Sequence, residues 1–345
     1  MPNDRGFPMR ILAIEPAGFK GHKKFNAYFL RCLRGIGKVT FVAPSDYLTS
    51  CDVDTRADIP ESLLRHNSKF GARWSAIRVL DYILKNIRLD DYDAIVFLAY
   101  ETISFSLRWP KGRKTFLFEH NNIEDALGSV VKTFFYKHIS ANCTHLTLLN
   151  HSAQYIQNAY RRSAVYIPHP YYRAGVSDSG IPIEPISPPN LSSHKIKIFS
   201  PSTSTPQSVQ GELKKYVTTT NGKYHAIFKG NITAKGEDWE TSPFFKNYEN
   251  LMQSCDRVFL GACFEYRVSG VAYEALSYGK IIAHLDSPFA RELMKDYPHL
   301  LFPIKAVSDI SELSIDPEKM DEDHRQYLID HSFLSICEKI RSILT

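Results

Sequence analysis

The sequence lacks the patterns that mark several classes of protein. Its six cysteines lie scattered over 345 residues, without a Cys-x-x-Cys pair or a metal-binding spacing, so we expect free thiols in a reducing compartment. The longest apolar run, Ala94–Tyr100, is far shorter than the roughly 20 residues that span a bilayer. The first residues, MPNDRGFPMR, contain no apolar core of a secretory signal. We therefore expect a cytoplasmic protein.

Two short motifs of nucleotide and metal sites are also missing. The G-x-G-x-x-G fingerprint of dinucleotide-binding domains does not occur, and the turn after the first predicted strand reads EPAGFKGHKKF instead. No D-x-D motif follows a predicted strand. The DVD at 52–54 lies in the polar segment SCDVDTRAD, and we interpret it as structural. We expect no bound metal.

The charge is distributed unevenly along the chain. Residues 1–168 carry 23 Lys and Arg against 15 Asp and Glu, whereas residues 169–345 carry 19 against 22. A basic first half suits an anionic surface such as a membrane leaflet, a lipid diphosphate or an acidic polymer, although a mildly basic solvated face explains the same counts. The basic residues form no dense patch and no nucleic-acid motif is present, so we expect no nucleic acid as a partner.

Strand-like and helical segments alternate in two regions. Apolar strands are predicted at 10–14, 38–43, 94–98, 115–118, 144–149 and 164–167, and again at 195–199, 224–228, 257–260 and 280–283. Helical periodicity lies between them, for example over 73–87 and 123–139. Regular alternation of this kind predicts α/β domains with a parallel sheet covered by helices on both faces.

A segment rich in proline, serine and glycine, GVSDSGIPIEPISPPNLSS, separates the two regions. We predict an N-terminal domain over 1–168, a linker over 169–193 and a second domain over 194–325. A C-terminal helix over 326–345 could pack back on the first domain. Open α/β sheets bind ligands outside the carboxyl ends of their strands, so we look for the site there.

The segment FEYRVSGVAYEALSYGKII predicts an anion site followed by a ribose site. Ser269 is the expected N-cap of a helix whose first residues, Gly270 and Val271, offer free N–H groups to a phosphate. Arg267 adds a charged fork that suits phosphate oxygens. Glu274 lies about one turn into the helix, where a carboxylate can accept hydrogen bonds from both hydroxyls of a ribose. A capped helix with a surface salt bridge is the alternative interpretation.

The same segment resembles the C-terminal signature of GT-B glycosyltransferases, especially those of family 4. Glu274, Ala275, Gly279 and Lys280–Ile282 match the frame of that signature. The segments LNHSAQYIQNAY and YIPHPYY resemble parts of the family's N-terminal domain, so the resemblance covers both halves in order. It implies two Rossmann-like domains that face each other across a cleft, and a nucleotide-sugar donor.

The resemblance assigns further residues to the donor. It implies that Glu274 binds the ribose and that Glu265 contacts the donor sugar. The two glutamates are one residue further apart than in the family pattern, so Tyr266 is an equal candidate for the sugar contact. The Arg and Lys that the family places after the first strand of the second domain are absent from FSPSTSTPQSVQ, where Ser200 can still offer a hydroxyl. Arg267 or Lys229 would neutralise the diphosphate instead.

Further candidates follow strands of the first half. Gly18 permits a tight turn against a ligand, and the resemblance places a donor-facing glycine loop there. We interpret His22, in the same turn, as a solvent-exposed histidine.

The segment FLFEHNNIED is the other candidate of the first half. Glu119 and His120 are expected to project into the cleft, and the resemblance implies a catalytic position for His120 near the donor sugar. A structural, hydrogen-bonded histidine is the alternative. Asn121, Tyr100 and Glu101 are weaker candidates for contacts with the acceptor.

The sequence therefore predicts a glycosyltransferase that moves a sugar from a nucleotide-sugar donor to a glycan or lipid-linked acceptor. Its expected role is cell-surface polysaccharide synthesis at the inner face of the membrane. The resemblance implies metal-independent catalysis with retained configuration and no cofactor besides the donor; for inversion, a cleft carboxylate or His120 would act as base. The alternatives are a non-hydrolysing sugar-nucleotide epimerase and a catalytically inactive glycan- or partner-binding protein. The donor base, the donor sugar, the acceptor and the oligomeric state stay open.

Overall fold

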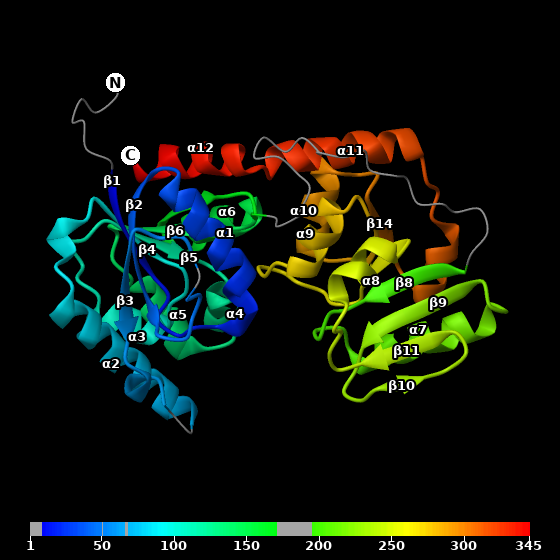
Figure 1. Ribbon diagram of the computed structural model, residues 1–345, viewed down its shortest axis with the longest axis horizontal. Helices are drawn as coiled ribbons and strands as arrows, with labels where there is room; N and C mark the ends of the chain where they lie inside the picture. The colour runs from blue at the N-terminus through cyan, green and yellow to red at the C-terminus, as the bar shows by residue number, and fades with distance from the viewer. Residues whose placement is uncertain (1–8, 50, 66–67, 171–194) are drawn as a thin grey trace. The chain divides into compact units, whose positions relative to one another are not determined.

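The computed structural model describes residues 9–49, 51–65, 68–170 and 195–345. The chain divides into two compact units, unit 1 with Met1–Pro170 and Phe333–Thr345, and unit 2 with Tyr171–Ser332 (Figure 1). Apart from its first two residues, the predicted linker lies outside the described residues. The last helix, α12 (Phe333–Leu344), belongs to unit 1 and packs on α1 (Lys23–Arg34).

Unit 1 is built on a seven-stranded sheet in the order β3-β2-β1-β4-β5-β6-β7, in which every neighbouring pair is parallel. The strands are β1 (Met9–Ile14), β2 (Gly37–Pro44), β3 (Thr55–Ile59), β4 (Ala94–Phe97), β5 (Thr115–Phe118), β6 (Cys143–Thr147) and β7 (Ser163–Tyr166). The strand order reverses between β1 and β4, and ligands of such sheets bind where the loops diverge. The sequence did not indicate β3, because TRADI is a largely polar strand at the sheet edge.

The helices of unit 1 follow the strands in alternation. They are η1 (Lys20–His22), α1, η2 (Glu61–Leu63), α2 (Lys69–Asn86), η3 (Leu89–Asp91), α3 (Thr102–Arg108), α4 (Asn122–Leu127), α5 (Val130–Lys137), α6 (Asn150–Tyr155), η4 (Ile156–Tyr160) and α12. The single helix predicted over 123–139 is two helices. Gly128 follows the last residue of α4, and Ser129 caps α5 by accepting a hydrogen bond from the Lys132 N–H.

Unit 2 has a second seven-stranded sheet, in the order β10-β11-β9-β8-β12-β13-β14. Only the pair of β10 (Ala234–Lys235) and β11 (Trp239–Ser242) is antiparallel. The other strands are β8 (Ile196–Ser200), β9 (Tyr224–Lys229), β12 (Arg257–Leu260), β13 (Ile281–Leu285) and β14 (Leu301–Ile304). The helices are α7 (Gln207–Thr219), α8 (Tyr248–Ser254), α9 (Gly270–Ser277), α10 (Pro288–Asp296), η5 (Val307–Glu312) and α11 (Pro317–Asp330). The α/β fold class predicted for both halves is confirmed.

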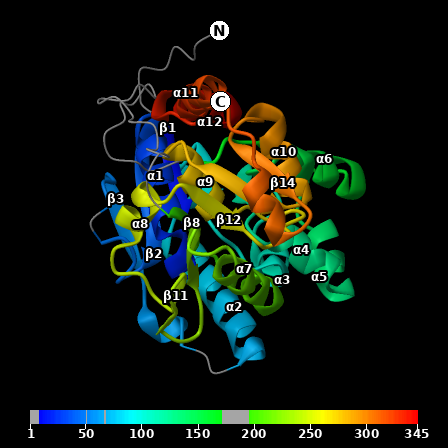
Figure 2. The same ribbon diagram turned by 90° about the vertical axis from the view of Figure 1, so that its right-hand side faces the viewer.

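Helices cover the sheet of unit 2 on both faces (Figure 2). Ile198, Phe259 and Ala283 point to the face covered by α7 and η5, where they join one apolar core. Alternate residues point to the other face, where Phe199 packs on Tyr248 of α8 with ring centroids 5.5 Å apart. Because β8, β12 and β13 are parallel neighbours, the loops that follow them emerge at one edge of the sheet.

Gly279 links α9 to β13 with a positive φ angle, a backbone conformation that is strained for residues with a side chain. Its φ is +63°, and a Cβ at this position would lie 2.7 Å from Nδ1 of His324. Gly211 in α7 is a matched control, because its φ is not positive and a Cβ there would meet no atom within 4 Å.

We expect Gly279→Ala to lower the free energy of unfolding by about 1–3 kcal/mol, because alanine is strained at this φ and crowds the buried imidazole. Gly211→Ala should raise it by about 0.5–1 kcal/mol, since alanine is the better helix former. Urea denaturation followed by circular dichroism measures both changes. Equal midpoints for the two variants would contradict the assigned backbone conformation of Gly279.

Candidate functional site

The start of α9 is an open helix N-terminus at the carboxyl edge of the unit 2 sheet. Ser269 is buried and caps the helix, its Oγ accepting a hydrogen bond from the Ala272 N–H at 3.4 Å. A Cβ on Gly270 would meet no atom within 4 Å. The first N–H groups of a helix have no acceptor within it, so those of Gly270 and Val271 remain for an anion.

Glu274 lies one turn further along α9 and is paired with a residue that the sequence analysis missed. Tyr248, the first residue of α8, makes a side-chain hydrogen bond to Glu274. Burial raises the pKa of Tyr248 well above its usual range, and the Glu274 charge and hydrogen bond raise it further. A carboxylate has about four acceptor sites on two oxygens, so a phenol that uses one of them orients the group.

The loop between β12 and α9 is held by aromatic packing. The Phe264 ring lies 6.3 Å from that of Phe289 in α10, and the Phe264 carbonyl accepts a hydrogen bond from the Phe289 N–H. The guanidinium of Arg267 lies over the Phe264 ring at 5.6 Å from its centroid. Glu265 is exposed, whereas Tyr266 and Arg267 are partly buried. The charged fork of Arg267 is therefore placed beside the helix start by a stacking contact.

The loop after β8 brings two buried hydroxyl groups to the same edge of the sheet. Ser200 and Thr205 are 2% and 4% exposed, and neither hydroxyl has a hydrogen-bond partner among the described residues. The loop packs on Gly261, the first residue after β12, where a Cβ would lie 2.6 Å from Cγ2 of Thr205. Lys229 ends the neighbouring strand β9. Buried hydroxyls without a partner are costly, and the oxygens of a ligand could satisfy them.

In unit 1, a buried carboxylate shapes the turn after β1. Oε1 of Glu15 accepts hydrogen bonds from the N–H groups of Ala17 and Gly18, at 3.3 Å and 3.1 Å, and Oε2 accepts one from Asn26 at 2.9 Å. Burial raises the pKa of Glu15, and these hydrogen bonds oppose the rise. Gly18 has a φ of +65°, and a Cβ there would lie 3.0 Å from Pro44. The geometry of the turn therefore explains the glycine at position 18 without any contact to a ligand.

His120 follows β5 and is held by a backbone carbonyl and by His22. Its Nε2 donates a hydrogen bond to the Leu98 carbonyl at 2.8 Å, and its ring stacks on that of His22 with centroids 4.0 Å apart. Burial, with smaller contributions from His22 and His169, lowers the pKa of His120 to about 3, and the hydrogen bond to the Leu98 carbonyl opposes them. His120 is therefore neutral near pH 7 and keeps Nδ1 as an acceptor. The interpretation of His22 as solvent-exposed is wrong, because its ring packs on His120.

Glu119 and Tyr100 face the core of unit 1. Both are buried, and Oε1 of Glu119 accepts hydrogen bonds from the Tyr100 hydroxyl at 2.5 Å and from Nδ1 of His145 at 2.6 Å. The expectation that Glu119 and His120 both project toward a ligand is wrong, because Glu119 is bonded inside the core, whereas His120 contacts the Leu98 carbonyl and the His22 ring. The hydroxyl expected to contact an acceptor is thus bonded inside the core.

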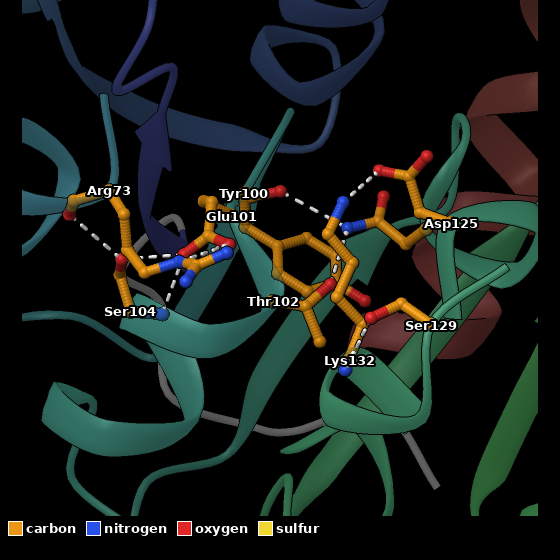
Figure 3. A network of polar contacts seen from close by, with 9 residues as sticks. Arg73, Tyr100, Glu101, Thr102, Ser104, Asp125, Ser129 and Lys132 are labelled. Carbon is orange, nitrogen blue, oxygen red and sulfur yellow. Dashed lines mark hydrogen bonds and ion pairs between the residues drawn. The ribbon is translucent and has the colours of Figure 1, made fainter. Parts of the chain in front are cut away.

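Glu101 caps α3 (Figure 3). Its Oε2 accepts hydrogen bonds from the N–H and the hydroxyl of Ser104, at 2.7 Å and 2.6 Å, and its Oε1 lies 3.7 Å from Nε of Arg73. A capping role accounts for Glu101 without an acceptor. Asn121 precedes α4, is exposed and makes no side-chain capping bond. Of the three residues expected to contact an acceptor, Asn121 is the one that lies at the surface.

No cluster of three or more potential metal ligands is arranged to hold an ion among the residues that the structure describes.

We expect Glu101→Ala to lower the free energy of unfolding by about 1 kcal/mol through loss of the cap, without changing the affinity for a nucleotide. Glu101→Asp should retain most of the stability, since aspartate also caps helices. Chemical denaturation and calorimetric titration measure the two quantities. A large loss of ligand affinity with unchanged stability would show that Glu101 acts on a ligand.

Neither a protein-family model nor a curated protein sequence matches the chain. Solved structures match it over nearly its whole length. The sucrose-phosphate synthase from Thermosynechococcus elongatus aligns with a TM-score of 0.66 and 11% identity, over 97% of this chain and 98% of that chain. Anabaena HepE, solved in complex with UDP and glucose, aligns with a TM-score of 0.65 and 14% identity, over 97% and 99%.

A putative UDP-N-acetylglucosamine 2-epimerase from Listeria monocytogenes aligns with a TM-score of 0.57 and 10% identity, over 96% of this chain and 94% of that chain. At these identities the matches establish the fold. The predicted fold class is confirmed, and membership of family 4 stays a prediction. The chain has the GT-B fold, which it shares with solved glycosyltransferases.

Proposed function

We propose that the chain is a glycosyltransferase whose nucleotide-sugar donor binds at the start of α9. The observation that carries this proposal is the pairing of an open, Ser269-capped helix start with the tyrosine-held carboxylate of Glu274. The rise of about 1.5 Å per residue separates the two by roughly 6 Å along the helix axis. A phosphate at the N–H groups of Gly270 and Val271 would therefore put the attached ribose near Glu274.

The second phosphate has candidate partners in the loop after β12 and at the ends of β8 and β9. The guanidinium of Arg267 suits phosphate oxygens, and the unpartnered hydroxyls of Ser200 and Thr205 could donate to them. Lys229 adds a cation at the end of β9. These groups would replace the Arg and Lys that the resemblance leads one to expect after β8. We assign the donor sugar to the exposed loop residue Glu265 and to Tyr266.

The transfer step needs a stabilised leaving diphosphate and a sugar held while positive charge develops on it. The helix dipole of α9 and Arg267 would supply the first requirement. His120 suits the second as a neutral imidazole, because it can accept a hydrogen bond from a sugar hydroxyl without adding a positive charge. With retained configuration, the leaving phosphate can take the proton of the acceptor hydroxyl, so a separate base is not needed. The proposed reaction is metal-independent.

Two alternatives are an epimerase that would use the same nucleotide site and a binding protein that would need no nucleotide. A non-hydrolysing epimerase shares the fold and would turn over a nucleotide sugar in the absence of any acceptor. A catalytically inactive binding protein would bind a glycan or partner without turnover, and the missing Arg and Lys after β8 favour it. Incubation of each nucleotide sugar with and without candidate acceptors, followed by NMR of the products, separates the three. Only the transferase releases nucleotide in an acceptor-dependent manner.

We expect one of the nucleotides UDP, GDP, ADP, CMP and TDP, or its sugar, to raise the melting temperature by several degrees. Glu274→Ala should abolish that shift, because the ribose loses its acceptor. Tyr248→Phe should weaken binding by about tenfold or more, since one hydrogen bond to a charged group contributes roughly 1.5–3 kcal/mol. Differential scanning fluorimetry measures the shifts.

Glu249→Ala is the matched control, because Glu249 is an exposed carboxylate next to Tyr248 on α8. It should retain the full shift. No shift with any nucleotide for the wild type would contradict the proposed donor site, and a shift that survives Glu274→Ala would contradict the ribose contact.

We infer further that the acceptor is lipid-linked and that unit 1 docks on an anionic membrane, in the service of cell-surface polysaccharide synthesis. Unit 1 exposes four large apolar side chains on and between α4 and α5, and Val130 is 88% exposed. We call Leu127, Val130, Val131 and Phe134 the α4–α5 patch. Lys132 and Lys137 lie on the same helix α5. Within the described residues, no helix has the length and apolar character to cross a bilayer, so docking would rest on such a surface.

We expect the triple substitution V130S/V131S/F134S to reduce binding to vesicles of anionic lipid at least tenfold, because each buried apolar side chain contributes about 1.5–3 kcal/mol. I232S/F244S is the control, since these two residues of unit 2 are equally exposed. Liposome flotation at low and moderate salt measures the binding. Wild-type protein that fails to float with anionic vesicles would remove the membrane proposal and leave the donor site untouched.

A further inference from the structure

Three histidines gather at the carboxyl edge of the unit 1 sheet. His120 follows β5, His22 ends η1 and His169 follows β7. The ring of Phe25 lies 5.3 Å from that of His120 and 5.3 Å from that of His169, measured between centroids. The sequence analysis singled out only His120, because the other two lie far from it in the chain.

The position of the His120 ring is fixed by two contacts. The hydrogen bond from Nε2 to the Leu98 carbonyl ties the ring to the segment after β4. A carbonyl oxygen only accepts, so Nε2 carries the hydrogen and Nδ1 carries the lone pair. The His22 ring covers one face of the imidazole at 4.0 Å between centroids and 27° between planes.

His22 is held in turn by the rigid turn after β1. Its N–H donates to the Phe19 carbonyl at 3.0 Å, and the Phe19 ring meets its edge with centroids 5.5 Å apart. The turn is set by the buried carboxylate of Glu15, which bonds the N–H of Gly18. Nδ1 of His22 is buried and has no hydrogen-bond partner among the described residues. The His22 ring is therefore held against His120 by the turn. Among the described residues, no hydrogen bond at its Nδ1 contributes to this position.

We propose that His22 is the positioning residue of His120: it covers the imidazole so that Nδ1 stays a neutral acceptor for a hydroxyl of the sugar substrate. This proposal rests on the proposed function for the identity of the ligand, but not for the His22–His120 contact. Burial lowers the pKa of His22 as well, so near pH 7 His22 is neutral and disfavours a proton on His120 by excluding water. At lower pH, where His22 is itself protonated, two imidazolium rings 4.0 Å apart would also repel each other.

The groups that act on the proton of His120 come from three segments. His22 of η1 and His169 after β7 disfavour the charged form, and the Leu98 carbonyl after β4 favours it. Burial has the largest effect and also lowers the pKa. Removal of His22 therefore raises the pKa of His120, although the remaining burial still holds it below its ordinary value, and the protonated form appears as the pH falls through the raised pKa.

The test is an NMR titration of the histidine ring nitrogens in the full chain. In the wild type, His120 should remain the neutral Nε2–H tautomer down to pH 5. In His22→Ala, its pKa should rise by roughly one unit or more, because the ring loses a like-charged and water-excluding neighbour. His22→Phe keeps the stacked ring without the charge, and it should preserve both the tautomer and most of the low pKa.

His138→Ala is the matched control, since His138 is an exposed histidine at the end of α5. It should leave the titration of His120 unchanged. An identical titration of His120 in the wild type and in His22→Ala would overturn the proposal. Loss of the neutral tautomer in His22→Phe would overturn the role of stacking.

Kinetics separate this proposal from the proposed function. If the wild type transfers sugar, His22→Ala should lose activity on acidification at a pH roughly one unit or more above the pH at which the wild type loses it, because the pKa of His120 rises by that amount. If the wild type transfers no sugar, the proposed function fails, and the NMR titration still decides whether His22 positions His120. An unchanged pH profile in an active His22→Ala variant would remove the role of His22 in the reaction.

Discussion

The parallel pairing of β12 with β8 on one side and β13 on the other is the constraint on which unit 2 depends. It makes the loops after these strands leave the sheet at one edge, so that the start of α9, with the partly buried carboxylate of Glu274, and two buried hydroxyls lie along it. Gly261 lets the loops after β8 and β12 touch, because a side chain there would collide with Thr205. The chemistry of the candidate donor site follows from this register, since each polar group lies at or just beyond the end of a strand.

The two units present different chemistry at the edges of similar sheets. Unit 2 offers a helix dipole, a guanidinium and hydroxyl donors, which suit an anion. Unit 1 offers a neutral imidazole in an aromatic surrounding, which suits a hydroxyl. Phosphate and sugar are the two parts of the nucleotide-sugar donor that we propose, and a neutral imidazole accepts a hydrogen bond from a hydroxyl without adding a positive charge. The proposed function therefore depends on the low pKa of His120, which keeps the imidazole neutral.

Sequence reasoning reached the parts of the structure that depend on local signals. The alternation of apolar strands and helices predicted both sheets, and Ser269 and Gly279 marked the two ends of α9 because caps have side-chain and backbone requirements of their own. It missed β3, which lies at the edge of its sheet, and β11, which lies next to the edge strand β10, because TRADI and WETS are largely polar. It also merged α4 and α5, although the Gly128–Ser129 pair separates them.

Contacts between distant segments lay beyond such reasoning. Tyr248 reaches Glu274 from another helix, and nothing in the polar segment around it signals the partner. Glu119 and His120 are adjacent polar residues after one strand, and the sequence does not indicate the direction of either side chain. In the structure Glu119 lies in the core and His120 lies at the edge of the sheet. The contact of His22 with His120 depends on the position of the turn after β1 near the end of β5, which the sequence does not indicate.

Hydrogen exchange of the backbone amides tests the central claim most directly, because it reports where a nucleotide binds without assuming turnover. The account predicts that the nucleotide that binds will slow exchange in residues 262–274, most of all at Gly270 and Val271. Binding that leaves this segment unchanged, with protection confined to other parts of the chain, would contradict it.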